Sequence, residues 1–255
     1  MIRDLFKGFV LQVQFLTRIP IPLRIDFNSR SFALGTVFAP LIGLCIGAFS
    51  AGAYILTGLL GIQTLAVLAA LVAEIAVTGG LHLDGLADTF DGFFSNRDRE
   101  NILTIMKDSR LGTNGAIVLI LLILVKYVLL VSLNEKYLIG CILIMPVLSR
   151  MTIPWSAGIS PYAGKDNTSV ASVIIANTGA LGIAAATILS LTISIIILKM
   201  AAVPLAIVII LFTLLANLYA KRKIGGITGD IFGAIIEISE VVFLIGILAL
   251  DRLWR

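Results

Sequence analysis

Three aspartates follow one another at helical spacing directly after a long apolar segment. Asp84, Asp88 and Asp91 lie in the stretch GGLHLDGLADTFDGFF, residues 79–94. At 100° per residue, their carboxylates fall within an arc of about 60° on one helix face. Like charges at this spacing destabilise a helix unless a cation lies among them. Hard oxygen ligands suit Mg²⁺ or Mn²⁺, so the block predicts a divalent-metal site made by Asp84, Asp88 and Asp91.

A second polar segment, KRKIGGITGDIFGAIIEISE, occupies residues 221–240. A basic run that includes Lys223 leads into a glycine-rich turn, and Asp230 then opens a helix that carries Glu237 one heptad later, about 20° away around the axis. A glycine-rich turn of this kind is typical of a phosphate cradle. We therefore predict substrate binding by the turn residues Lys223, Gly225, Gly226 and Gly229, and further metal ligands in Asp230 and Glu237.

Glu237 and Glu240 also lie about two turns into an apolar helix. Ionisable groups at such depth are costly unless they face a polar cavity or a partner. The alternative to a metal role is therefore a structural pair with Lys126 or Arg150.

The segment IMKDSRLGTNG, residues 105–115, lies just before another apolar helix. Lys107, Asp108 and Arg110 alternate in sign within four residues, and the helix that starts near Ala116 presents N–H groups at its positive end. This pattern suits polyphosphate binding. The alternative is a solvated loop with internal ion pairs.

Two single residues are further candidates. Arg150, near a helix end, either binds a phosphate or carboxylate or extends its charged end to the membrane surface. His82 is the single histidine, and on a regular helix it would point about 200° away from Asp84. It is either a local hydrogen-bonding residue or a proton carrier beside an anionic site.

The elements that must position these residues are membrane helices. Apolar residues make up 59% of the 255-residue chain and charged residues only 13%, and the mean hydropathy is +1.07. A span needs about 20 apolar residues, and lipid leaves no partner for unpaired backbone groups. We predict an all-α, polytopic membrane protein with one domain over residues 1–255. Seven predicted spans cover residues 32–59, 62–81, 116–133, 137–154, 181–198, 202–220 and 231–250.

The N-terminal residues 1–22 show no pattern of a secretory signal. Leu5, Phe9, Val13 and Leu16 recur at helical spacing, and Pro20 and Pro22 follow. This pattern predicts an amphipathic helix that lies on the membrane surface.

The basic residues are unevenly distributed between the predicted loops. With the N-terminus in the cytoplasm, fourteen of the nineteen Lys and Arg residues face inward, which is a strong positive-inside bias. The N-terminus and the polar loops are thus predicted to be cytoplasmic and the C-terminus external. The pI near 9.2 follows from these loops, which favour anionic lipid or an anionic substrate and give no reason to invoke nucleic acid.

The three polar motifs resemble those of a known family. GGLHLDGLADTFDG, IMKDSRLGTNGA and GGITGDIFGAIIEISE are similar to signatures of the cobalamin synthase family, the membrane adenosylcobinamide-GDP ribazoletransferases. FLTRIPIP (residues 15–22) and FAPLIGLCIGA (residues 38–48) resemble the N-terminal region of that family. The chain departs from the family in YAGKDNTS (residues 162–169), where an acidic and glycine-rich run is more usual.

The resemblance implies a transferase of the cell membrane. In this family α-ribazole, or its 5′-phosphate, displaces GMP from adenosylcobinamide-GDP with Mg²⁺, in the final assembly of the cobalamin nucleotide loop. It implies Mg²⁺ on the aspartates, phosphate contacts from the basic residues, and a proton acceptor in Asp91 or His82. The residues expected to take part in catalysis are Asp91, His82, Lys107, Asp108 and Arg110, with Arg150 binding substrate.

Two other functions remain as alternatives. The aspartate spacing also resembles that of CDP-alcohol phosphatidyltransferases, although their Ala-Arg element is absent. A transporter would explain charges inside spans, but the charges concentrate at one membrane face and no repeat of broken helices is visible. The acceptor's phosphorylation state, its base and any homo-oligomer stay open.

Overall fold

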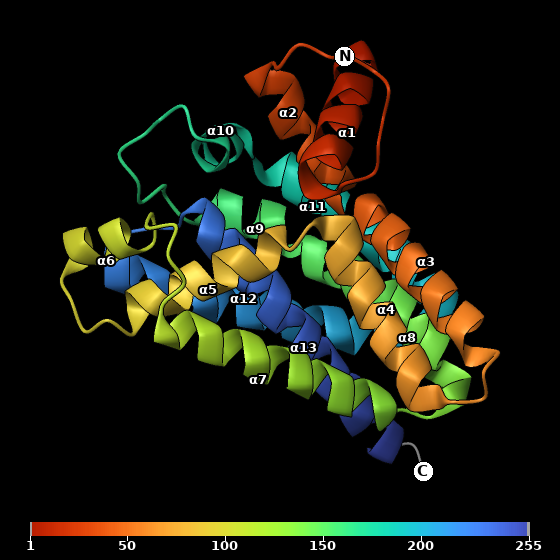
Figure 1. The fold of residues 1–255 in the computed structure, drawn as a ribbon. Helices are drawn as coiled ribbons and strands as arrows, with labels where there is room; N and C mark the ends of the chain where they lie inside the picture. Colours follow the sequence, from red (N-terminus) through yellow and green to blue (C-terminus); the bar gives the residue numbers. More distant parts are fainter. Residues whose placement is uncertain (1, 254–255) are drawn as a thin grey trace.

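The computed structural model describes residues 2–253, and the regular structure in this range is helical apart from one isolated bridge between Tyr162 and Ile227 (Figure 1). This agrees with the predicted all-α class. The helices are α1 (Ile2–Leu16), α2 (Ser29–Gly35), α3 (Ala39–Gly58), α4 (Gln63–Thr78), α5 (Leu81–Phe93), α6 (Arg99–Ile105), α7 (Thr113–Val131), α8 (Glu135–Arg150), α9 (Thr152–Ile159), α10 (Val170–Asn177), α11 (Ala180–Leu198), α12 (Ala202–Ile224) and α13 (Gly229–Leu253), with short 3₁₀ turns at Thr36–Phe38 and Lys199–Ala201.

The predicted number of seven spans is not confirmed. In the described residues, five segments are long and apolar enough to cross a membrane: Ser29–Gly58, Thr113–Val131, Glu135–Ile159, Ala180–Ile224 and Gly229–Arg252. A sixth exists only if α4 and α5, bent by 87°, are taken together. The predicted spans 181–198 and 202–220 correspond to α11 and α12. These two helices form one apolar segment that is interrupted at Lys199, where φ is 53°. The side of the C-terminus depends on this number and stays a prediction.

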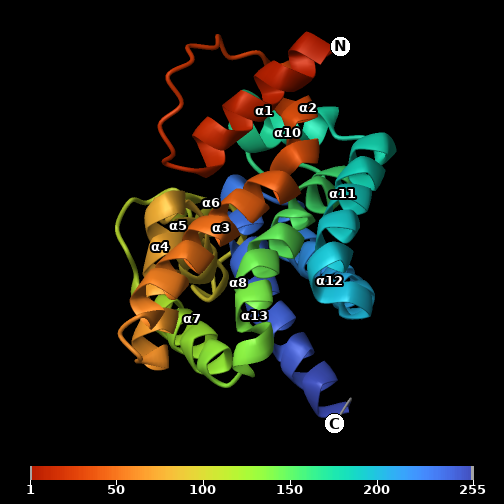
Figure 2. The same ribbon diagram turned by 90° about the vertical axis from the view of Figure 1, so that its right-hand side faces the viewer.

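Several helices pack around α13. It contacts α5, α7, α8, α9 and α12, and Figure 2 shows it running through the bundle to the C-terminus. A second tight contact joins α3 and α8, where a Cβ on Gly47 would lie 2.5 Å from the carbonyl oxygen of Leu143. Small residues let membrane helices approach this closely, and dispersion contacts then hold them together.

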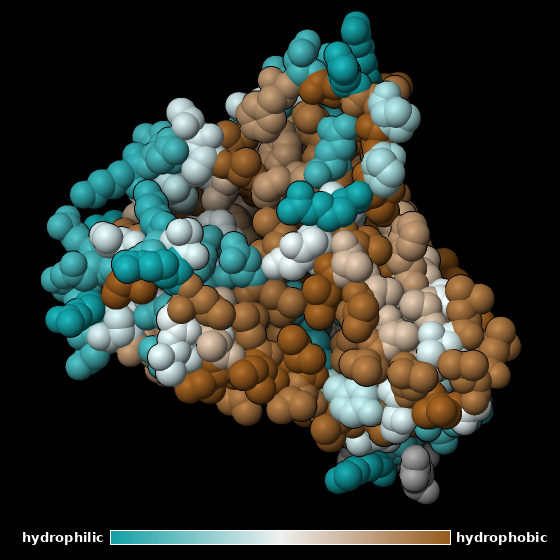
Figure 3. All heavy atoms as spheres, viewed as in Figure 1, coloured by the Kyte–Doolittle hydropathy of each residue, from teal (hydrophilic) through white to brown (hydrophobic). Residues whose placement is uncertain are grey.

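The outer surface is divided into an apolar part and a polar part. Large side chains such as Ile120 and Leu124 on α7 and Leu211 on α12 are more than half exposed, which water would penalise and lipid tails do not. Figure 3 shows apolar side chains over α3, α4 and α7, and polar ones around α6 and its neighbouring loops. The polar end is therefore the face at which the loops with the candidate site residues meet water.

The predicted N-terminal helix forms as α1 and ends before Pro20. Its apolar face is partly buried against protein, because α1 packs on α2 and the amide of Gln12 donates to the carbonyl oxygen of Phe32 at 2.9 Å. Phe6 and Phe15 stay exposed, and a position of α1 on the membrane surface stays a prediction. This helix becomes one wall of the cavity described next.

Candidate active site

The aspartate helix is directed across the bundle by a pair of glycines. Gly79 and Gly80, with φ values of 64° and 72°, end α4 and begin α5 in a left-handed conformation that glycine adopts at little cost. Helix α5 then leaves α4 at 87° and packs against α13 and α7.

The aspartate helix crosses the start of α13 in backbone contact. A Cβ on Gly85 would lie 2.7 Å from the carbonyl oxygen of Asp230, and a Cβ on Gly233 would lie 2.9 Å from that of His82. Only glycine permits such an approach without a shift of the backbone. The two aspartate-bearing segments, far apart in the sequence, thus meet.

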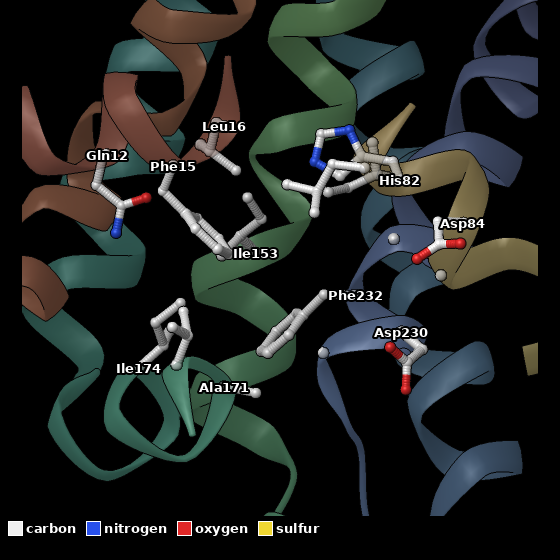
Figure 4. A pocket seen from close by; sticks show the side chains of 16 residues that line it. Gln12, Phe15, Leu16, His82, Asp84, Ile153, Ala171, Ile174, Asp230 and Phe232 are labelled. Carbon is white, nitrogen blue, oxygen red and sulfur yellow. The ribbon is translucent and has the colours of Figure 1, made fainter. Parts of the chain in front are cut away.

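A cavity of about 220 Å³ opens where these helices cross, between α1, α5, α9, α10 and α13. Asp84 and Asp230 lie on one side of this space, Ile153 and Ile174 lie across from them, and the ring of Phe232 points in between (Figure 4). The cavity therefore has an acidic side and an apolar side.

A second hollow continues from the first. It shares Gly229 and Asp230 with the cavity, and it adds Lys107 and Tyr162 to the lining. A lysine and a carboxylate along one continuous hollow suit an anion and its counter-cation.

The electrostatics of the acidic side favour a cation. Asp88 is not among the residues that line either hollow, but burial first, and then the neighbouring charges of Asp84, Asp230 and Asp91, raise its pKa from 3.8 to about 7. Among the residues described, no three His, Cys, Asp or Glu side chains already converge enough to hold one metal ion. Mg²⁺ usually binds through one or two carboxylates and substrate phosphates rather than in an all-protein cage, so this donor set fits an ion that arrives with a diphosphate.

Asp91 has a different partner from the other aspartates. Its Oδ2 accepts the backbone N–H of Gly112 at 2.7 Å, and its Oδ1 accepts that of Gly115 at 2.8 Å. A carboxylate at the first turn of a helix satisfies unpaired N–H groups and complements the helix dipole. Asp91 therefore anchors the start of α7 to α5.

The basic segment before α7 divides into two parts. Arg110, with an 87% exposed side chain, pairs with Asp108 at 2.6 Å, and hydrogen bonds from Arg110 lower the pKa of Asp108 to about 2. This pair matches the alternative of a solvated internal ion pair. Lys107 is separate from it and lines the second hollow.

The glycine turn after α12 has mainly a structural role, because its glycines allow backbone conformations and contacts that a side chain would prevent. Gly225 ends α12 with a φ of 85°, and a side chain on Gly226 would collide with the carbonyl oxygen of Pro161. Ile227 pairs with the 161–163 segment. Of the predicted turn residues, Gly229 lines both hollows, whereas Lys223, Gly225 and Gly226 line neither.

Arg99 joins the end of α12 to the segment around Ala163, a structural role that the sequence analysis did not predict. Its Nε donates to the carbonyl oxygen of Ile224 at 2.6 Å, and its Nη2 donates to that of Ala163 at 3.3 Å. In the sequence it is one basic residue among several, with no pattern that marks this role.

Glu237 and Arg150 lie away from the two hollows, in a buried ion network. Lys126 Nζ donates to Glu237 Oε2 at 2.6 Å and also pairs with Glu240, which in turn pairs with Arg150. The side chain of Arg150 is fully buried. The network corresponds to the structural alternative for these residues, because buried charges need partners.

His82 links this network to the cavity. Its Nδ1 lies 3.3 Å from Arg150 Nη2, and its imidazole, 4% exposed, lines the cavity that Asp84 also lines.

The apolar lining of the cavity from α1, α9 and α10 was not predicted from the sequence, since apolar residues at helical spacing indicate only a packed face.

Comparisons with known proteins agree over nearly the whole chain. The family described as cobalamin-5-phosphate synthase matches residues 8–248. A protein of Clostridium novyi (strain NT) is 38% identical over 95% of this chain and 97% of its own length, and one of Clostridium acetobutylicum is 36% identical over 96% of both. One from Acetivibrio thermocellus is 38% identical over 94% of this chain and 96% of its own length. All three are named adenosylcobinamide-GDP ribazoletransferase. No solved structure matches the chain.

Proposed function

This chain belongs to the cobalamin-5-phosphate synthase family, and from that premise we propose that it joins α-ribazole, or its 5′-phosphate, to adenosylcobinamide-GDP. The observation that carries the proposal is the meeting of Asp84 and Asp230 at one cavity in a chain related over its length to ribazoletransferases. The product is adenosylcobalamin or its 5′-phosphate, and GMP leaves.

The reaction exchanges one phosphoryl ester bond for another. A ribose hydroxyl oxygen of the acceptor forms a bond to the phosphorus attached to the cobinamide, and the bond from that phosphorus to the GMP oxygen breaks. The electron pair of the broken bond stays on the GMP oxygen, and the hydroxyl proton passes to water. Such transfers depend on positioning and charge neutralisation more than on covalent chemistry.

Three carboxylates suit a Mg²⁺ ion in this site: Asp84, Asp88 and Asp230. When bound, Mg²⁺ would neutralise diphosphate charge and favour departure of GMP. Asp91 and Glu237 are left out of the proposed shell because Asp91 accepts two backbone N–H groups and Glu237 pairs with Lys126. Lys107 lines the adjoining hollow and supplies a positive charge for a phosphate oxygen.

The face that carries the site is proposed to be cytoplasmic in the cell membrane. Lys165 and Glu100 lie 3.7 Å apart on this face, whereas Lys136 lies beyond the opposite end of α7. In a background that lacks Cys45 and Cys141, single cysteines at Lys165 and Lys136 should label from opposite sides, with Lys165 protected in intact cells. External labelling of both positions would exclude this orientation.

The activity is tested with purified protein in liposomes. With adenosylcobinamide-GDP, α-ribazole and Mg²⁺, we expect GMP release, and Asp84→Asn should lower it by at least about 100-fold. Asp26→Asn, at an exposed position, is the matched control. CMP release from CDP-diacylglycerol with no GMP release would instead favour the phosphatidyltransferase alternative.

A further inference from the structure

One polar atom in the apolar part of the cavity lacks a partner. His82 Nε2 is buried without a hydrogen bond, and of the buried unpartnered side-chain atoms in residues 2–253 it alone belongs to a residue that lines this cavity. Burying a polar group without a partner costs free energy. We propose that the apolar side of the cavity binds the aromatic base of the acceptor nucleoside, and that His82 Nε2–H donates to a ring nitrogen of that base. The assignment rests on the proposed function.

The tautomer of His82 follows from its neighbour. Arginine carries N–H donors and no acceptor, so Arg150 Nη2 must donate to His82 Nδ1 across their 3.3 Å contact. An imidazole whose Nδ1 accepts carries its proton on Nε2. His82 is thereby a hydrogen-bond donor toward the cavity, and its one lone pair is already engaged. It therefore does not accept the ribose hydroxyl proton.

The His82 ring is held in place by the buried network on its Nδ1 side. Arg150 pairs with Glu240, and its Nη1 donates to Ser149 Oγ at 2.9 Å. Ser149 Oγ in turn donates to Glu240 Oε1 at 3.0 Å. All of these side chains are buried, so the guanidinium and the ring have little freedom to turn. A fixed donor favours a ligand with an acceptor at one position.

The size and lining of the cavity match a flat bicyclic base. Its volume of about 220 Å³ is smaller than the clefts of roughly 300–1,000 Å³ that bury drug-sized ligands, so the corrin ring must stay outside. Phe15, Ile153 and Phe232 give apolar walls.

The chemistry of the candidate bases separates them. Guanine has several donors and acceptors, which these walls would leave unpaired at considerable cost. The benzimidazole ring of a ribazole is apolar except for one ring nitrogen with a lone pair, which matches a single N–H donor. Its ribose end would then extend toward Asp84 and Asp230.

The test compares two acceptors that differ at the ring nitrogen. Benzimidazole riboside and indole riboside have the same ribose hydroxyls, but indole has C–H where benzimidazole has the acceptor nitrogen. With the wild-type protein in liposomes, kcat/KM for GMP release should favour the benzimidazole riboside by about 10- to 100-fold, because indole leaves a buried donor unpaired.

Substitutions at His82 assign that preference to one atom. In His82→Asn an amide oxygen can replace Nδ1 as acceptor and nothing reaches the Nε2 position, so the ratio of the two kcat/KM values should fall toward one. In His82→Gln an amide N–H can occupy the Nε2 position, so the preference should persist. An unchanged ratio in His82→Asn overturns the inference.

Two further outcomes keep the inference separate from the proposed function. Equal use of both ribosides by the wild-type protein overturns the inference alone, whereas no GMP release with either overturns the function and the inference together. If His82→Asn does not fold, Phe15→Ala decides. Phe15 is 38% exposed, and its loss should raise KM for the riboside and leave KM for adenosylcobinamide-GDP unchanged. The reverse pattern would assign the apolar side to the other substrate.

Discussion

Gly85 of α5 lies against the backbone of Asp230 at the start of α13: a Cβ on Gly85 would lie 2.7 Å from the Asp230 carbonyl oxygen and 2.9 Å from its Cα. Real Cβ atoms do not approach a backbone this closely. This contact allows Asp84 and Asp230 to line one cavity. The acidic side of the site therefore depends on a residue that contributes no side chain.

Replacing Gly85 should lower the activity because the new side chain displaces α5 relative to α13. Gly85→Ala forces α5 and α13 apart, and an error of about 1 Å in a positioned group can cost about 100-fold in rate. We expect GMP release to fall by at least about 10-fold. Gly52→Ala in α3 is the control, because nothing lies within 4 Å of the added Cβ. Normal kcat in Gly85→Ala would show that the close crossing is not required.

Asp230 should share one metal site with the aspartates of α5. Asp230→Asn should raise the Mg²⁺ concentration for half-maximal GMP release, since a neutral amide binds Mg²⁺ less well than a carboxylate. Combined with Asp84→Asn, the loss should be smaller than the sum of the two single losses, because groups that act as a unit are non-additive. Strict additivity, as found for distant independent sites, would separate the two residues.

Asp91 and Asp84 should differ in their effects on stability. Asp91→Ala removes the acceptor for two N–H groups at the start of α7, and loss of a helix cap costs about 0.5–2 kcal/mol. Asp84→Ala relieves repulsion between carboxylates, so its melting temperature in detergent should hold or rise. A melting temperature for Asp91→Ala at or above that of Asp84→Ala would contradict the anchoring role.

Asp88 should make the metal-free protein less stable as pH rises. Its pKa is about 7 in the folded state and ordinarily 3.8, so between these values the folded protein binds the extra proton and stability falls with increasing pH. Without divalent cations, the melting temperature should decrease from pH 5 to pH 7. Asp88→Asn should flatten this slope, and saturating Mg²⁺ should do the same by replacing the proton. A slope that Asp88→Asn does not change would assign it to other groups.

Lys126 should be a stabilising residue of the buried network. It pairs with Glu237 and Glu240, and all three side chains are at least 94% buried. Removing one partner of a buried pair costs about 3–5 kcal/mol, because it leaves an uncompensated charge. Lys126→Met should lower the melting temperature in detergent strongly, and Glu237→Gln in the same protein should restore part of it. The control is Lys136→Met at an exposed position, which should have little effect.

Much of this protein follows from the sequence without a structure. Apolar composition and the length of apolar runs determine the all-helical membrane class, because lipid leaves no other way to satisfy the backbone. The spacing of Asp84, Asp88 and Asp91 places three carboxylates along one helix, and the structure has that helix as α5. The motifs also identify the family, since each is a contiguous string of residues.

Tertiary contacts decided which of these residues meet, because helical periodicity gives the direction of a side chain only around its own axis. Asp91 and Asp88 share a face, yet one accepts N–H groups from α7 and the other lies among carboxylates. Glu237 follows Asp230 by one heptad, but α13 is long enough that Asp230 lines the cavity while Glu237 reaches Lys126 inside the bundle. The path of the apolar segments was also decided in three dimensions. Hydropathy detects apolar length, whereas the 87° bend after Gly80 and the break at Lys199 depend on single backbone positions and on what packs around them.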